Sequence, residues 1–213
     1  LRLLTAKEAM SVLRDKLTAT GRYRVLMTRD RDIFVPLAER VRLARNARAK
    51  LFISVHADSI RGAADNARGV TVYTLSDRAS DADSERLAER ENKADAIAGL
   101  DLSEEPSEIA DILIDLTRRE TRLYSANFAR TLAGEMRQVT RMHSLPLRSA
   151  GFQVLRAHDI PSVLVELGFV TSRRDLEMLT SAIWRERTAD SVAKAVDRFF
   201  AARAGTVAPA ARR

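Results

Sequence analysis

The sequence feature that most constrains the fold is an apolar run that ends at a histidine. Residues 51–55, Leu-Phe-Ile-Ser-Val, have the character of a strand buried on both faces, which is typical of a parallel sheet. His56 follows this strand directly, and a second apolar run, Ser162–Val165, ends at Glu166. Because ligands bind beyond the carboxyl ends of parallel strands, the two runs predict a site at one edge of such a sheet.

The order of helices and strands predicts an α/β fold. Apolar residues recur at three- and four-residue spacing in a first helix, and β-forming residues mark the strand after it. Helix and strand then alternate again, which favours a mostly parallel twisted sheet flanked by helices. The expected helices are residues 3–20, 36–48, about 118–141 and two within 173–200; the expected strands are residues 23–28, 51–55, 69–75, 151–155 and 162–166.

One segment does not fit this alternation. Residues 77–98 carry a dense run of charged side chains, and a second amphipathic stretch, Ile109–Leu116, follows a break at Pro106. About forty residues without a strand exceed an ordinary crossover in an α/β domain. We therefore interpret residues 78–117 as a helical insertion, and we expect residues 204–213 to form a disordered tail.

Composition narrows the classes of function. The chain has no cysteine, which excludes disulfides, thiol nucleophiles and zinc ribbons. No run approaches the roughly 18 apolar residues of a membrane span, so we expect no transmembrane segment. The net charge of +7 is spread along the chain. Because a clustered basic stripe and a recognised motif are both missing, we expect no nucleic-acid partner.

The two side chains at the strand ends suggest metal-assisted hydrolysis. A carboxylate at the end of a buried strand loses hydration, which favours use as a general acid or base. A histidine beside it could bind a metal ion, although a lone histidine is more often structural. A catalytic zinc ion needs three protein ligands, so His56 and Glu166 are not sufficient. His143 and His158 lie in loop-like stretches that are typical of surface or structural histidines.

Four short motifs resemble those of the zinc-dependent N-acetylmuramoyl-L-alanine amidases. Residues 54–58, Ser-Val-His-Ala-Asp, are similar to the Ser-x-His-x-Asp/Asn element of that family. Residues 161–169, Pro-Ser-Val-Leu-Val-Glu-Leu-Gly-Phe, are similar to its Pro-x-x-Leu-Val-Glu-x-Gly-Phe element. Residues 28–30 and 37–40 resemble two further elements, in the order and spacing of the family. The resemblance covers about residues 3–200.

The resemblance implies an activity and a cofactor. His56 would bind Zn²⁺, and Glu166 would be the catalytic carboxylate. The substrate would be peptidoglycan, cleaved at the amide bond between N-acetylmuramic acid and the L-alanine of the stem peptide. Such enzymes work in the periplasm or cell envelope, and we expect a monomer.

Two zinc ligands of the family, a histidine and a glutamate, are missing from the expected places. The histidine belongs to a strand expected before residue 1, and the glutamate falls near or upstream of Arg2. Glu8 lies too far along the first helix to replace it. Since the motifs around His56 and Glu166 are intact, we expect residues 1–203 to be an amidase catalytic domain whose first strand is missing.

The insertion resembles the regulatory segment of cell-division amidases. The similarity lies in residues 87–95 and 111–116. In those enzymes a helix covers the zinc site, and an activator with a LytM-like fold displaces it. The resemblance implies that a carboxylate of this helix occupies a zinc position, with Glu91 as the candidate and Glu85 and Glu89 as rivals.

Two other hypotheses remain open from the sequence. The missing ligands and the long charged helices would also suit a non-catalytic module that binds peptidoglycan or a partner protein through a degenerate zinc site. Nucleic-acid binding through the basic surface is the third hypothesis, and a flat salt dependence of DNA binding would exclude it.

Overall fold

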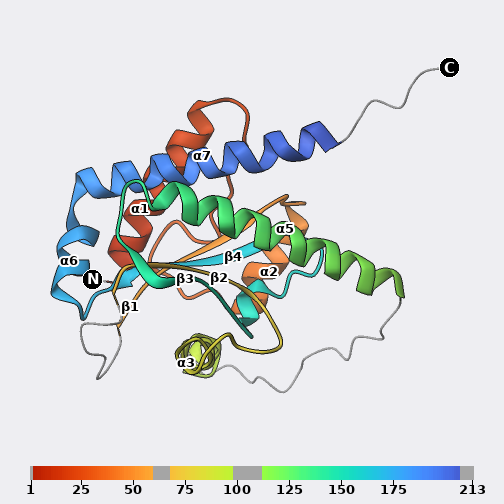
Figure 1. Cartoon of the computed structure of the whole chain (residues 1–213), viewed down its shortest axis with the longest axis horizontal. Coiled ribbons are helices and arrows are strands. Elements are labelled where there is room, and N and C mark those ends of the chain that lie inside the picture. Colours follow the sequence, from red (N-terminus) through yellow and green to blue (C-terminus); the bar gives the residue numbers. More distant parts are fainter. Residues whose placement is uncertain (1, 60–67, 98–111, 207–213) are drawn as a thin grey trace.

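The computed structural model describes residues 2–59, 68–97 and 112–206, and its centre is a four-stranded sheet (Figure 1). The strand order is β1-β4-β2-β3. Strands β1 and β4 are parallel, β2 and β3 are parallel, and β2 and β4 are antiparallel, so the expected mostly parallel α/β sheet is confirmed. The strands are β1 (Phe52–Asp58), β2 (Val70–Leu75), β3 (Met142–Ala150) and β4 (Ser162–Phe169).

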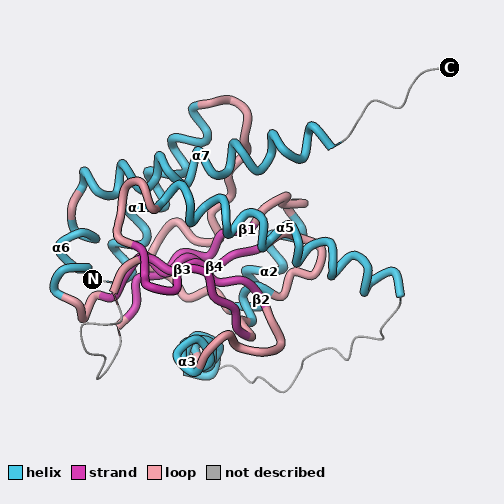
Figure 2. The backbone as a smooth tube through the Cα atoms, in the orientation of Figure 1, coloured by secondary structure: helices cyan, strands magenta, loops and turns pink. Residues whose placement is uncertain are grey.

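Helices cover both faces of this sheet (Figures 1 and 2). One face packs against two long helices, α1 (Arg2–Ala19) and α5 (Ile112–Met136), and a third, α7 (Ala182–Thr206), packs against both of them. On the opposite face lies α3 (Ala82–Asn92), which Figure 1 shows end-on beneath the sheet. The remaining helical elements are α2 (Leu37–Asn46), α4 (Ala94–Ile97), the 3₁₀ helix η1 (Gln153–Leu155) and α6 (Arg173–Thr180).

Alternation along β4 separates the two faces of the sheet. Val163 and Val165 join the larger apolar core with the three long helices, while Leu164 joins a second cluster beneath α3. Glu166 follows Leu164 at a spacing of two residues and therefore points to the same face as Leu164. All eight residues of β4 are buried, as its apolar sequence and central position require.

Two of the predicted strands are wrong. Residues 23–28 form no strand, because this stretch has no hydrogen-bonded ladder with a neighbouring strand. Residues 151–155 contain η1, whose Val154 and Leu155 are buried in the cluster beneath α3. A short apolar run marks burial and does not by itself distinguish a strand from a buried turn.

The strand that the sequence did not reveal is β3. Pro146 lies within it, and proline within a sheet is confined to edges and bulges. Both conditions hold here, since β3 is an edge strand and its pairing with β2 shifts between Met142 and Leu147. His143 therefore lies on this strand and not in a loop.

Helix boundaries agree with expectation near the N-terminus and differ elsewhere. The long helix expected at about 118–141 is α5, which begins at Ile112, inside the segment interpreted as an insertion. Residues 98–111 of that segment lie outside the described residues. Helix α7 extends to Thr206, so residues 204–206 are helical, and residues 207–213 of the expected tail lie outside the described range. Along the described residues, no helix combines the length and apolar character needed to cross a bilayer.

The N-terminus of α2 is capped from a distant part of the chain. Pro36 occupies the cap position and makes no side-chain capping bond. Both carboxylate oxygens of buried Asp95 accept a hydrogen bond from the Leu37 main-chain N–H, at 3.1 Å each. Asp95 therefore satisfies a helix-end donor and links α4 to α2.

Replacing Asp95 with Ala is expected to lower the free energy of unfolding by about 1 kcal/mol, because the Leu37 N–H loses its cap. Urea unfolding would measure the loss. Asp83→Ala is the matched control, since Asp83 is exposed and paired only with the neighbouring exposed Arg86. An equal loss in both variants would contradict the capping role.

Candidate active site at the carboxyl ends of β1 and β4

The register of the two parallel strands places the two predicted site residues side by side. His56 of β1 pairs with Glu166 of β4, and both lie at the carboxyl end of their strand. The next strand, β2, places Thr71 opposite Glu166. Sheet geometry therefore fixes the separation of an imidazole and a carboxylate, as the sequence predicted from the two apolar runs.

Glu166 is completely buried, with a relative exposure of 0%. Its Oε1 accepts a hydrogen bond from the Asp58 main-chain N–H at 3.0 Å. Its Oε2 is buried, and no group among the described residues donates to it. Burial, together with the nearby charge of Asp58, raises the pKa of Glu166 well above its ordinary value. Burial therefore favours the protonated form of this carboxyl group.

His56 contacts a carboxylate from α3. Its Nδ1 lies 3.0 Å from Oε2 of Glu91, and its Nε2 lies 3.0 Å from the Ser54 hydroxyl. Burial alone would raise the pKa of Glu91, but the hydrogen bond and the charge of His56 outweigh it and lower that pKa to about 2. Glu91 is therefore a carboxylate that the site binds in its charged form.

His56, Asp58 and Glu91 form a group that could hold a metal ion. One ligand atom from each residue lies within 4.8 Å of the other two. Imidazole nitrogen and carboxylate oxygen are both zinc donors. Burial raises the pKa of Asp58, and the charge of Glu91 adds to this effect. Two carboxylates so close together are stabilised by a cation between them.

Helix α3 is fixed over this group by an apolar face and by polar contacts at its C-terminal end. Leu87 and Ala88 are buried in the cluster with Tyr73, Phe152 and Leu164. Arg90 donates to the main-chain oxygen of Ser59 at 3.0 Å and lies 3.4 Å from an Asp58 carboxylate oxygen. The helix therefore contacts the site both through its core-facing side and through charge pairs.

Asn92 at the end of α3 makes two hydrogen bonds to main-chain groups beside β3. Its amide nitrogen donates to the Gly151 oxygen at 2.8 Å, and its amide oxygen accepts from the Gln153 N–H at 2.8 Å. Because Asn92 is adjacent to Glu91, this pair of bonds fixes the turn of the helix that contacts His56.

The other sequence candidates lie apart from this group. Glu85 and Glu89 are exposed on the outer side of α3. His143 lies on β3 beside Arg148, and His158 precedes β4, at the end of that strand opposite Glu166. Glu8 of α1 pairs with Arg185 of α7.

Sequence reasoning assigned no role to Asp58, Arg90 or Asn92. Asp58 was visible only as part of a motif, and a spacing of two from His56 along a strand would place it on the same face. No local signal marks Arg90 or Asn92, since their partners are distant in the sequence.

Comparison with known proteins agrees with this geometry. A family model described as N-acetylmuramoyl-L-alanine amidase matches residues 6–198. The chain is 35% identical over 175 residues to the amidase AmiA of Escherichia coli K12, covering 82% of this chain and 60% of AmiA. It is 34% identical over 188 residues to AmiC of Neisseria meningitidis, covering 88% of this chain and 44% of AmiC. The chain thus spans about half the length of these relatives.

Solved structures share the fold. The CwlD amidase of Clostridioides difficile, in complex with the GerS lipoprotein, matches with a TM-score of 0.66 at 15% identity, covering 94% of this chain and 87% of CwlD. The catalytic domain of CwlV from Bacillus (Paenibacillus) polymyxa matches with a TM-score of 0.61 at 18% identity, covering 94% and 86%. With the family model matching nearly all of the chain, the protein belongs to the N-acetylmuramoyl-L-alanine amidase family.

Proposed function

We propose that this chain is the catalytic domain of a zinc-dependent peptidoglycan amidase that cleaves the bond between N-acetylmuramic acid and the L-alanine of the stem peptide. The observation that carries the proposal is the pair His56 and Glu166, a metal-binding side chain beside a fully buried carboxylate on adjacent parallel strands. The family match supplies the substrate class. The same substrate implies that the protein works in the periplasm or cell envelope.

The residues present fit a zinc ion. The donor atoms of His56, Asp58 and Glu91 are close enough together to converge on one ion, and their chemistry suits zinc. The buried Oε2 of Glu166 has no donor among the described residues, so it is open to a water molecule or a substrate amine. In the open enzyme His56 would remain a ligand, and the ligands that the resemblance implies upstream would complete the set.

Glu166 would act as the proton carrier of the reaction. Bound zinc would polarise the amide carbonyl and acidify water. The Asp58 N–H holds Oε1, which leaves Oε2 to accept a proton from the attacking water. Glu166 would then donate this proton to the nitrogen of the departing L-alanine, and its raised pKa suits both steps.

Helix α3 would keep the enzyme inactive until a partner displaces it. While α3 is docked, Glu91 would occupy a metal position beside His56, so the docked helix and an open position on the metal exclude each other. An activator with a LytM-like fold would shift the population toward the undocked state, in which the site is open. The regulatory segment in this proposal is residues 78–117, with Glu91 as the blocking side chain.

Zinc content tests the metal assignment. Elemental analysis is expected to find about one zinc ion per molecule in a form extended upstream. Less zinc is expected in residues 1–213, where His56, Asp58 and Glu91 would have to hold the ion without the further ligands that the resemblance implies. Hydrolysis of muropeptides by the extended form, followed by mass spectrometry, would identify the bond that is cut. No zinc in either form would favour the non-catalytic binding module and would remove the role proposed for Glu166.

A further inference from the structure

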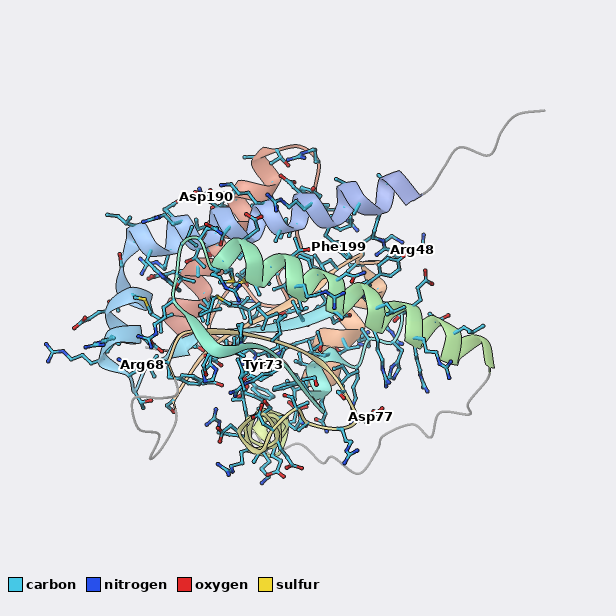
Figure 3. The ribbon with its side chains drawn as sticks, in the orientation of Figure 1. Arg48, Arg68, Tyr73, Asp77, Asp190 and Phe199 are labelled. Carbon is cyan, nitrogen blue, oxygen red and sulfur yellow. The ribbon has the colours of Figure 1, made fainter. Side chains whose placement is uncertain are left out.

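A second polar group lies beneath α3, at the other end of that helix from His56. Arg148 of β3 pairs with Tyr73 of β2 in the sheet register, and Tyr73 belongs to the cluster that α3 covers. Figure 3 places Tyr73 between the sheet and α3. Arg148 and Tyr73 therefore belong to the same face of the sheet as Glu166, with Tyr73 one strand and Arg148 two strands away from β4.

Arg148 is a buried cation whose anionic partner comes from α3. Its side chain is only 9% exposed, and its Nε lies 3.5 Å from Oδ2 of Asp81. The guanidinium also contacts Nδ1 of His143 at 3.4 Å and interacts with the Tyr73 hydroxyl. Asp81 is thus the one carboxylate within ion-pair distance of this guanidinium among the described residues.

Asp81 belongs to the element that the proposed activation removes. It is the N-cap of α3, and its carboxylate accepts the Ser84 N–H at 2.9 Å. If α3 leaves the sheet as proposed, Arg148 would lose this partner and become uncovered on the same face of the sheet as Glu166. An arginine without its carboxylate is costly to leave unpaired, and its planar donors suit another carboxylate.

The spacing of the two contacts suits an extended peptide. Asp81 is the N-cap of α3, and Glu91 lies ten residues further along the same helix. At 1.5 Å per residue the two are about 15 Å apart. An extended peptide covers that distance in about four residues. A chain cut at Glu166 could therefore reach Arg148 with a carboxylate located beyond its second residue.

We propose that Arg148, with Tyr73 and His143, is a subsite for a free carboxylate of the stem peptide, and that Asp81 of α3 occupies it in the closed enzyme. This inference rests on the proposed peptidoglycan substrate. Helix α3 then covers the groove at two points: Glu91 contacts the metal ligand His56, and Asp81 takes the place of a substrate carboxylate. Arg148 is a binding residue in this proposal and takes no part in the bond cleavage.

The test uses two ligands and the full-length gene product. The ligands are an N-acetylmuramoyl tetrapeptide with free carboxylates beyond the second residue, and the same compound with those carboxylates amidated. Arg148→Gln is expected to weaken binding of the first ligand by about 10- to 100-fold, because a charge-assisted pair is lost. Binding of the amidated ligand is expected to stay the same or tighten. Calorimetry gives both affinities without requiring cleavage.

Asp81→Asn tests the internal carboxylate separately. Asn retains the N-cap of α3 while removing the charge. Both ligands are expected to bind about 3- to 10-fold more tightly, since the closed state loses its contact with Arg148. Unchanged affinities would overturn the assignment of Asp81 as the occupant.

A matched control and the possible outcomes separate this inference from the proposed function. Arg45→Gln removes an arginine that pairs with Asp159 outside the groove, and it is expected to change neither affinity. If Arg148→Gln lowers the affinity for both ligands equally, Arg148 has only a structural role and the subsite is overturned. If Arg148→Gln weakens binding of the free-carboxylate ligand alone, but neither the unmodified protein nor any variant cleaves either ligand, the subsite stands and the amidase proposal fails.

Discussion

Replacing Glu166 with Gln is expected to lower the rate of amide cleavage by about 10²- to 10⁴-fold, the usual contribution of a general acid–base group. The amide oxygen of Gln can still accept the Asp58 N–H, so the local structure should be retained. What the variant loses is the oxygen that takes a proton from water and returns it to the leaving amine. Initial rates on muropeptides, with zinc content measured in parallel, would detect the loss.

Two controls make this result specific to proton transfer. Glu177→Gln changes an exposed carboxylate that pairs with Arg173, and it should leave the rate unchanged. The melting temperature of Glu166→Gln should not fall, because the variant removes a buried ionisable group. A variant that folds, binds zinc and retains full activity would exclude Glu166 from the chemistry.

Replacing Leu87 with Ala is expected to raise the activity measured without an activator by about 10- to 30-fold. Leu87 is buried between α3 and the sheet, and truncation removes about 2 kcal/mol of apolar contact from the docked helix. In the proposed closed enzyme the open site would be the minor state. Weakening the docked helix by about 2 kcal/mol would then raise the population of the open site by about 10- to 30-fold. Muropeptide release over time would measure the change.

Glu89→Ala is the matched control on the same helix. Glu89 faces solvent, so its removal should leave the basal rate unchanged, and this variant also tests the choice of Glu91 over its rival. Glu91→Ala should activate, since it frees His56 without altering the apolar face. If Leu87→Ala and Glu89→Ala show the same basal rate, α3 does not limit access to the site.

The strands that position the site could be predicted because each is marked by a short run of adjacent apolar residues. The apolar run of β4 reflects burial on both faces at the centre of the sheet. The expectation of two-sided burial was wrong for β1, which is an edge strand with mostly half-buried residues. Strand β3 was hidden by Pro146 and by its polar residues, which an edge strand tolerates. The stretch 23–28 has strand-forming residues, but a strand exists only when a neighbour pairs with it.

The same distinction applies to the candidate site. His56 and Glu166 could be predicted because each directly follows a recognisable strand. The capping role of Asp95, the main-chain contacts of Asn92 and the pairing of Arg148 with Asp81 depend on residues far away in the sequence. No periodicity or motif marks such partners, and only the folded chain brings them together.

The central position of β4 has a consequence for how this domain is synthesised and folds. Synthesis produces β1, β2 and β3 before β4, yet β4 lies between β1 and β2. Asp58 and Glu166 are 108 residues apart in sequence, so the pairing that brings them together closes a long loop and should form slowly. A nascent chain therefore contains no pairing of His56 with Glu166 until β4 has emerged. Until β4 is synthesised, β1 and β2 lack the strand that lies between them, and their unpaired edges are exposed. We therefore expect the unfinished chain to bind chaperones.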